Sequence, residues 1–192
     1  MKSKVYVFLA ILGLILASIA CGTSDSDVIV NPSGEEEAPS QQEPTDLPEI
    51  GTARSNPAPA GSEVIVDDMA LKILGVVRPA DDIIEAGNMF NTEAESDQEY
   101  VLIELHVTCK KSIDDQCSIS SYWNISLIGS SGIEYDPEWF VTGVEGLLES
   151  IDFYGDAVVS GYIPFIIKQS DTNLILVYEP ILFGDTVYLA VP

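Results

Sequence analysis

The sequence predicts an all-β fold, an antiparallel β-sandwich of about seven or eight strands over residues 63–192. Three observations lead to this prediction. Apolar side chains recur at every second position in several runs, which is the period of a half-buried strand. Turn-forming stretches such as Gly129-Ser130-Ser131-Gly132 separate these runs, and little of the domain has helical spacing.

The first twenty residues have the layout of an export signal. Lys2 and Lys4 precede an apolar stretch from Val5 to Leu16, and small residues follow up to Ala20. The apolar part is shorter than the roughly 20 residues that a membrane-spanning helix needs. We therefore expect residues 1–20 to be a cleaved signal peptide.

The segment Ser18-Ile19-Ala20-Cys21 resembles the lipobox of bacterial lipoproteins, in which a signal peptidase cuts before a cysteine that carries lipid. Ser18 departs from the leucine that is usual there, whereas Ala20 and Gly22 fit the pattern. The resemblance implies lipid on Cys21, and two acyl chains suffice for stable anchoring, at about 0.8 kcal/mol per CH₂ group. The alternatives are plain secretion or an uncleaved anchor.

Residues 21–62 have the composition of a linker. Beyond the cysteine, this segment holds six of the chain's 11 prolines among Ser, Thr, Gln and Glu, with few large apolar side chains. Such a segment cannot bury enough surface to offset its conformational entropy. We expect a disordered tether with a root-mean-square span of about 35 Å that holds the domain off the membrane.

The domain begins with two expected strands, Val64–Val66 and Met69–Val77. A turn or two of helix is expected from Ala80 to Ala86, before Gly87. The longest run is Tyr100–Cys109, with apolar residues at odd positions and glutamate, histidine and threonine among the even ones. One face of this strand is therefore expected to be buried and the other wet.

The next run, Ile119–Leu127, keeps the same parity, which places Trp123 on the buried face. Residues 157–167 alternate in the same way. Pro164 within them indicates an edge strand or a bulge, because proline cannot donate a ladder hydrogen bond. Two closing strands are expected, at Leu174–Tyr178 and Thr186–Val191.

Three segments, EYVLIELHVTC, LIGSSGIEYDP and GDAVVSGYIPFIIK, together resemble a family of bacterial immunoglobulin-like (telokin-like) lipoprotein domains. This family has no known function and is related to secreted immunogenic antigens. Gly155, Gly161 and Phe165 match its late strand, and the resemblance covers about residues 63–192. It implies an immunoglobulin-like sandwich and export, but no activity. The cysteine pair of the domain is a departure from the family.

The stretch CKKSIDDQC places Cys109 at a strand end and Cys117 just before the next run. Besides Cys21, these are the two cysteines of the chain, an even number in an oxidising compartment. We expect a disulfide that staples a hairpin loop. A redox pair or a zinc site is the alternative, although seven intervening residues fit neither spacing well.

The chain is strongly acidic, with 31 Asp and Glu against 8 Lys and Arg and a net charge of −23. This charge repels phosphates, so we expect no nucleic acid partner, and it favours cations or basic partners. Adaptation to salty surroundings is the simpler explanation. Calcium on carboxylates such as Glu93 to Glu99 is an open alternative, although no EF-hand spacing occurs.

Enzymatic chemistry has weak support in the sequence. The single histidine, His106, falls on the expected wet face without a nucleophile motif, so we expect a surface residue. Carboxylates are abundant, and a glycosidase needs only two across a cleft, which leaves a hydrolase as the least favoured reading. We expect no enzyme, no metal site and no cofactor.

Two aromatic stretches supply the candidate recognition residues. EYDPEWF contains Tyr135, Trp139 and Phe140, and DFYGD contains Phe153 and Tyr154. Aromatic side chains are enriched in binding surfaces, but they also plug the open ends of sandwiches, and packing is the favoured interpretation.

The sequence therefore predicts a non-enzymatic binding or interaction module, anchored by lipid outside the bacterial cell membrane. The expected partner is a protein, a cell-wall component or a small ligand. The alternative is a structural accessory subunit of an envelope assembly.

Overall fold

The structure is a computed structural model that describes residues 49–181 and 184–192. The predictions of a signal peptide, of lipid on Cys21 and of a tether up to residue 48 lie outside the described residues.

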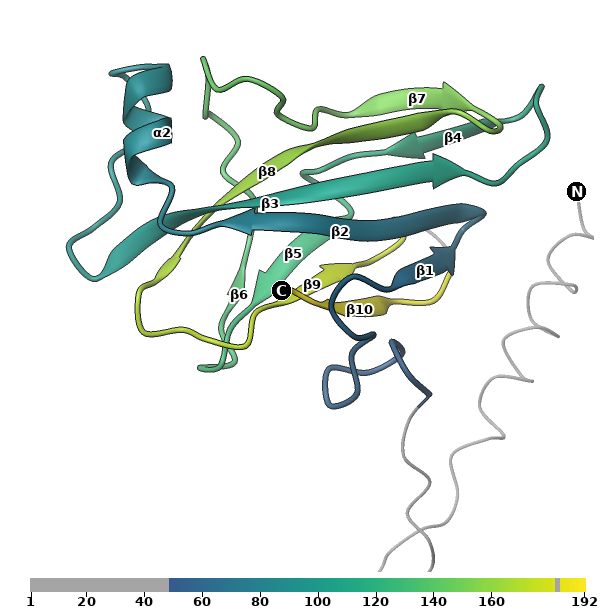
Figure 1. Ribbon diagram of the computed structural model, residues 1–192, viewed down its shortest axis with the longest axis horizontal. Helices are drawn as coiled ribbons and strands as arrows, with labels where there is room; N and C mark the ends of the chain where they lie inside the picture. The colour runs from purple at the N-terminus through teal and green to yellow at the C-terminus, as the bar shows by residue number, and fades with distance from the viewer. Residues whose placement is uncertain (1–48, 182–183) are drawn as a thin grey trace, which may run out of the picture. The chain divides into compact units, whose positions relative to one another are not determined.

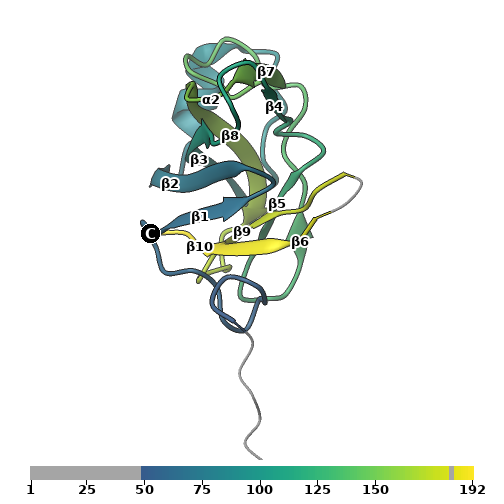
Figure 2. The same ribbon diagram turned by 90° about the vertical axis from the view of Figure 1, so that its right-hand side faces the viewer.

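Two four-stranded antiparallel sheets make up the sandwich (Figures 1 and 2). The first sheet has the order β1 (Glu63–Val66), β2 (Met69–Val77), β3 (Gln98–Cys109) and β8 (Val158–Lys168). The second has the order β10 (Val187–Ala190), β9 (Ile175–Tyr178), β5 (Ile125–Ile128) and β6 (Glu134–Tyr135). A separate pair is formed by β4 (Gln116–Ile119) and β7 (Ile151–Tyr154).

The strand order is that of an immunoglobulin-like fold. Strands β2, β3 and β8 correspond to A, B and E of such a sandwich, and β10, β9, β5 and β6 correspond to G, F, C and C′. The predicted antiparallel β-sandwich is thus confirmed. The described residues contain ten strands rather than seven or eight, because one expected run is split into β4 and β5, and because β6 and β7 lie outside the expected runs.

The core follows the period-two pattern of β3. All five odd positions from Val101 to Cys109 are fully buried, and they pack in one cluster with residues of the opposite sheet such as Leu127 and Leu176. Each large apolar side chain that is buried in this way contributes about 1.5–3 kcal/mol.

The prediction of a wet outer face is wrong for the first half of β3. Tyr100 and Leu102 are buried there, in a second cluster that includes Ile84 of helix α2 (Asp81–Gly87) and Val141. The helix lies by the N-terminal start of β3 in Figure 1, where it covers this part of the sheet. The expected helical turn between the second and third strands is confirmed.

The expected strand Ile119–Leu127 is interrupted, and the prediction that Trp123 is buried is wrong. A turn separates β4 from β5, and Asn124 holds it: its side-chain oxygen accepts from the Ser120 backbone at 3.2 Å. The side-chain nitrogen of Asn124 donates to the Glu179 carbonyl at 3.0 Å. Trp123 lies within this turn and not on a strand, so the alternation does not apply to it, and its side chain is 67% exposed.

The edge position predicted for Pro164 is confirmed. Strand β8 ends the first sheet, and its register with β3 runs without a shift. The Pro164 carbonyl faces away from β3 and accepts a hydrogen bond from Glu138 at 2.8 Å. Proline fits there because its missing N–H is not needed by the β3 ladder.

The disulfide between Cys109 and Cys117 is present, but the expected hairpin is not. Cys109 ends β3, whereas Cys117 lies in β4, which pairs with β7 instead of β3. The bridge therefore joins the first sheet to the two-stranded sheet. Both cysteines are buried.

The described chain pairs with the sandwich before residue 63. Ala58 is buried and forms a bridge with Leu189, and the Gly51 carbonyl accepts from Tyr188 at 2.8 Å. These residues occupy the free edge of β10, so part of the expected linker is structured. None of the helical segments in residues 49–181 and 184–192 has the length and hydrophobicity of a membrane span.

Candidate functional site

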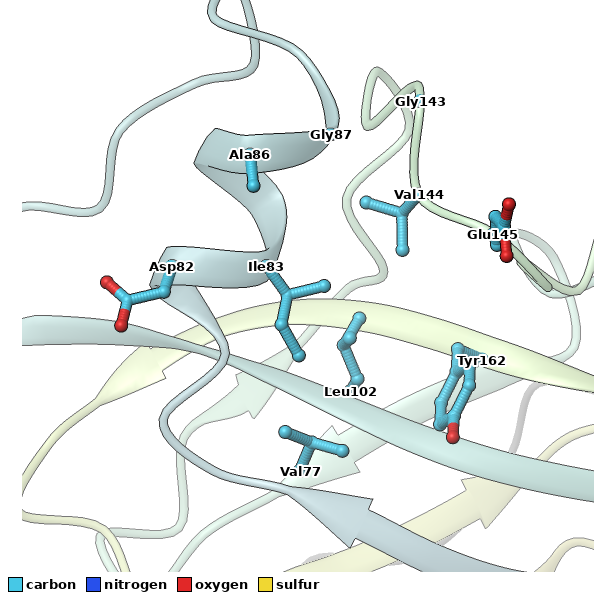
Figure 3. Close-up of a pocket in the computed structure, with 10 residues that line it drawn as sticks. All are labelled: Val77, Asp82, Ile83, Ala86, Gly87, Leu102, Gly143, Val144, Glu145 and Tyr162. Carbon is cyan, nitrogen blue, oxygen red and sulfur yellow. The ribbon is translucent and has the colours of Figure 1, made fainter.

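A groove on the outer face of the first sheet is the principal candidate site (Figure 3). Its volume is about 490 Å³, within the range of about 300–1,000 Å³ that is usual for ligand sites. Helix α2 forms one wall, a loop between β6 and β7 forms the other, and side chains of β2, β3 and β8 form the base. The lining residues are Val77, Asp82, Ile83, Ala86, Gly87, Leu102, Gly143, Val144, Glu145 and Tyr162.

The second wall belongs to a loop of residues 138–146 that is held to β8 at both ends. The Glu138 backbone donates to the Pro164 carbonyl at 2.8 Å, and the Tyr162 backbone donates to the Gly146 carbonyl at 2.7 Å. Leu148 then donates to the Tyr162 carbonyl at 2.8 Å. Both ends of the loop are therefore anchored to β8, at Pro164 and Tyr162, which are two positions apart on that strand.

The tip of the 138–146 loop is tied to the chain that follows α2. The Asn91 side-chain oxygen accepts from the Thr142 backbone at 2.9 Å, and its nitrogen donates to the Thr142 carbonyl at 3.0 Å. The Asn88 side chain donates to the Thr142 hydroxyl at 2.7 Å. These bonds set the distance between the two walls of the groove.

Two glycines close one end of the groove. Gly87 ends α2 and Gly143 lies opposite it, with a φ of +76° that non-glycine residues rarely adopt. A Cβ atom on Gly87 would lie 3.1 Å from the Gly143 carbonyl, and a Cβ on Gly143 would overlap the Gly87 carbonyl oxygen. The two backbones meet there because neither residue has a side chain.

The groove is mainly apolar inside. In Figure 3 the side chains of Ile83, Leu102 and Val144 point into the space between helix and loop, whereas the Asp82 carboxylate points away from it. Glu145 stands at the opposite side, and the Tyr162 hydroxyl is the remaining polar side-chain group of the lining. This arrangement suits the apolar part of a ligand or of a partner chain.

The five candidate recognition residues are not brought together. Phe153 is buried in the main core at 5% exposure, and Tyr135 packs against that core. Tyr154 is 52% exposed on the two-stranded sheet. Trp139 and Phe140 stand on the 138–146 loop, 45% and 83% exposed. Packing thus accounts for two of the five.

Tyr135 has a structural partner, Asp171, to which its hydroxyl donates at 2.5 Å. Burial of Asp171 by itself favours the neutral acid, but hydrogen bonds from Tyr135, Ser131 and Ser130 outweigh it and lower the pKa of Asp171 to about 2. Burial, followed by the bond to Asp171, raises the pKa of Tyr135. The carboxylate holds the β5–β6 turn in place.

Trp139 belongs to an aromatic cluster with Tyr122 and Trp123. Its ring stacks on Tyr122 with a centroid distance of 5.0 Å and meets Trp123 edge-to-face, also at 5.0 Å. Beside the cluster lies a hollow of about 250 Å³ lined by Trp123, Glu179, Pro180 and Ile181.

His106 lies on the outer face of β3, and its Nδ1 is 2.8 Å from the Ser160 hydroxyl on the paired strand β8. The part of the chain that the structure describes gathers no group of three His, Cys, Asp or Glu side chains that could hold a metal. In the segment singled out for calcium, Glu99 forms an ion pair with Arg78 at 2.6 Å.

The groove residues and Asp171 were not identified from the sequence. One usable indication was Leu102, a large apolar residue at an even position of a strand whose odd positions form the core. Such a residue calls for a cover on the outer face, and α2 is that cover.

Solved structures of bacterial proteins are similar to this chain in fold. YcdA, a candidate lipoprotein of Bacillus subtilis, matches with a TM-score of 0.51 at 17% identity, over 69% of this chain and 38% of YcdA. YjhA of Bacillus subtilis matches with a TM-score of 0.50 at 13% identity, over 70% of this chain and 98% of YjhA. The secreted protein MPT63 of Mycobacterium tuberculosis matches with a TM-score of 0.46 at 12% identity, over 71% of this chain and 98% of MPT63.

At these identities the similarity concerns the fold alone, and this chain spans well under half the length of YcdA. No family model matches the sequence, and no curated protein matches it.

Proposed function

We propose that this protein is a non-enzymatic binding module, anchored by lipid outside the cell membrane, and that it takes its partner in the groove between α2 and the 138–146 loop. The groove carries the proposal: an apolar site of ligand size, with walls positioned by hydrogen bonds rather than by chain connectivity alone. Sites of this kind are formed before the ligand arrives, which reduces the entropy lost on binding.

The extracytoplasmic location rests on three further observations. The segment up to Cys21 resembles a lipoprotein signal. A buried disulfide such as Cys109–Cys117 persists in oxidising compartments. YcdA, which is similar in fold, is described as a candidate lipoprotein. Membership of the telokin-like lipoprotein domains is part of this proposal.

The partner is a protein or a cell-wall component that presents an apolar group. Nucleic acid is disfavoured by the net charge of −23. A structural accessory subunit remains the second candidate function, because the exposed apolar side chains of Met89 and Phe90 lie just after α2. Hydrolysis has less support, because the groove lining is mainly apolar and one of its two carboxylates, that of Asp82, points away from the groove.

The test compares what the immobilised full chain retains from envelope extract before and after the groove is filled. Ala86 lines the groove and is exposed, so Ala86→Trp places an indole inside it without disturbing the core. We expect at least one retained component to fall about tenfold for this variant, as judged by quantitative mass spectrometry.

Ala60→Trp is the matched control, because Ala60 is also exposed and precedes β1, away from the groove lining. It is expected to retain the same components as the original chain. Equal retention by both variants would show that the groove is not the binding site. A thermal melt of each variant shows whether a loss of binding reflects unfolding.

A further inference from the structure

The hollow beside the aromatic cluster has a composition that differs from that of the groove. It combines an exposed indole, Trp123, with the carboxylate of Glu179 and the apolar surface of Pro180 and Ile181. No candidate recognition residue from the sequence lines it.

The backbones at Trp123 and Glu179 are held at fixed positions relative to each other, although both side chains are exposed. Asn124, next to Trp123, bonds to Glu179 on both sides: the Glu179 backbone donates to the Asn124 carbonyl at 2.8 Å, and the Asn124 side chain donates to the Glu179 carbonyl at 3.0 Å. The edge-to-face contact with Trp139 supports the indole further. The indole and the Glu179 backbone are therefore preorganised.

The charge of the hollow is uncompensated. Within residues 49–181 and 184–192, the structure gives the Glu179 carboxylate no hydrogen bond and no ion pair. The whole chain carries −23, so a cation approaching this surface is attracted over a long range as well as by the local carboxylate.

An arginine side chain matches all of these features. Its planar guanidinium stacks on aromatic faces, most favourably on tryptophan, and pairs with carboxylates through two parallel hydrogen bonds. Its aliphatic stem covers apolar surface such as that of Pro180 and Ile181. Ile181 and Trp123 are each 67% exposed, and a chain segment covers such apolar surface with the arginine stem and its neighbours, which a free small cation does not.

We propose that the hollow of Trp123, Glu179, Pro180 and Ile181 binds an arginine side chain on a basic segment of a partner protein. The guanidinium lies over the Trp123 indole and pairs with Glu179. This site is separate from the groove, so it stands or falls independently of the proposed function.

The chain carries a built-in reporter for this site, since its two tryptophans, Trp123 and Trp139, both belong to the aromatic cluster. The probe is the peptide acetyl-Gly-Leu-Arg-Leu-Gly-amide, titrated into the full chain at low ionic strength. We expect a saturable change in tryptophan emission that weakens as salt is added. The same peptide with citrulline, a neutral analogue of arginine, is expected to bind about tenfold more weakly.

Two variants test the assigned groups. Glu179→Gln is expected to weaken the arginine peptide about fivefold and to reduce the salt dependence, whereas Glu95→Gln, which removes an exposed carboxylate elsewhere, is expected to leave both unchanged. Trp123→Leu is expected to abolish binding, and Trp139 remains as the reporter. If the leucine variant fails to fold, Trp123→Phe replaces it and is expected to bind the peptide with intermediate affinity.

Equal binding of the arginine and citrulline peptides would overturn the proposal, because it would show an apolar rather than a cationic site. Unchanged binding by Glu179→Gln, or no emission change with either peptide, would overturn it as well.

Discussion

Asp171 shows how one buried carboxylate organises two loops, the β8–β9 connection and the β5–β6 turn. It lies between β8 and β9, and it accepts hydrogen bonds from the Ser131 backbone at 2.7 Å and from the Ser131 hydroxyl at 2.8 Å. Gly129 lies so close that a Cβ atom there would overlap the carboxylate. The Asp171 carboxylate thus joins the two loops, because it accepts hydrogen bonds from protein groups where an exposed carboxylate would accept them from water.

This arrangement predicts a pH-dependent contribution to stability. The pKa of Asp171 is lowered from 3.8 to about 2, and the difference corresponds to about 2 kcal/mol. Because the folded pKa lies below the unfolded one, the contribution is complete above about pH 4 and is lost as the pH falls through about 2.

The measurement is urea denaturation of the original chain and of Asp171→Asn at pH 6, 4 and 2. The original chain is expected to be more stable by at least about 2 kcal/mol at pH 6, and the gap is expected to close towards pH 2. A gap that is the same at all three pH values would show that the carboxylate charge has no role there.

The burial and the partners of single side chains are the features that the sequence predicts least well. Tyr135 and Phe153 look alike as aromatic residues in polar loops, yet one donates to Asp171 and the other is part of the core. Trp123 was expected to be buried because alternation was extended across Asn124. The side-chain bonds of Asn124 hold the turn that contains Trp123, and a periodic pattern contains no information about them.

Helix α2 and the 138–146 loop are the elements that convert a flat sheet face into a groove. The helix is only seven residues long, so its stability comes from packing of residues such as Ile84 rather than from helix propensity. The loop depends on its anchors at Pro164 and Tyr162 and on Thr142 at its tip.

The contact between Gly87 and Gly143 can be tested with a matched pair of substitutions. Gly143→Ala introduces a Cβ atom that overlaps the Gly87 carbonyl, and Gly146→Ala introduces one at nearly the same φ of +74°, but with the nearest atom 3.7 Å away. Both variants bear the cost of a positive φ, about 1 kcal/mol, and Gly143→Ala is expected to lose about 1–3 kcal/mol more because of the overlap.

Chemical denaturation monitored by circular dichroism measures the two stabilities. Hydrogen exchange of the Thr142 amide, which donates to Asn91, is expected to accelerate in Gly143→Ala and to change less in Gly146→Ala. Equal losses of stability in the two variants would mean that the backbones are free to separate at no cost.

At the scale of elements, the alternation predicted most strands well, because β3, β8 and β9 each bury one face against the other sheet. The sequence alone did not predict which strands pair. The segment between the two cysteines resembles a hairpin loop, yet β4 pairs with β7, which is more than thirty residues further along the chain. Which strands become neighbours depends on how the tertiary structure places them, and not on their order in the sequence.

As a whole molecule, the chain is expected to be held at a membrane by its N-terminus. Replacing Cys21 by serine removes the atom that would carry lipid. We expect the original protein to fractionate with membranes and the Cys21→Ser variant to be released, because loss of two acyl chains removes the free energy of insertion.

Mass spectrometry of the membrane fraction is expected to find acylated Cys21 as the first residue of the original protein. An unmodified mature terminus at another position would rule out the anchor. The Cys109→Ala/Cys117→Ala variant serves as a control, since it leaves the proposed lipid site intact and is expected to stay with the membranes.

The sequence by itself determined the fold class, the acidic surface charge and the cysteine pair, because alternation, composition and cysteine count are properties of the linear chain. The tertiary structure decided which faces are covered and where sites form. Leu102 lies at the base of a groove only because α2 and Gly143 meet above it, and Trp123 and Glu179 line one hollow only because Asn124 binds the Glu179 backbone. These contacts join residues far apart in the sequence, and side-chain volume and hydrogen bonding across that distance decide them.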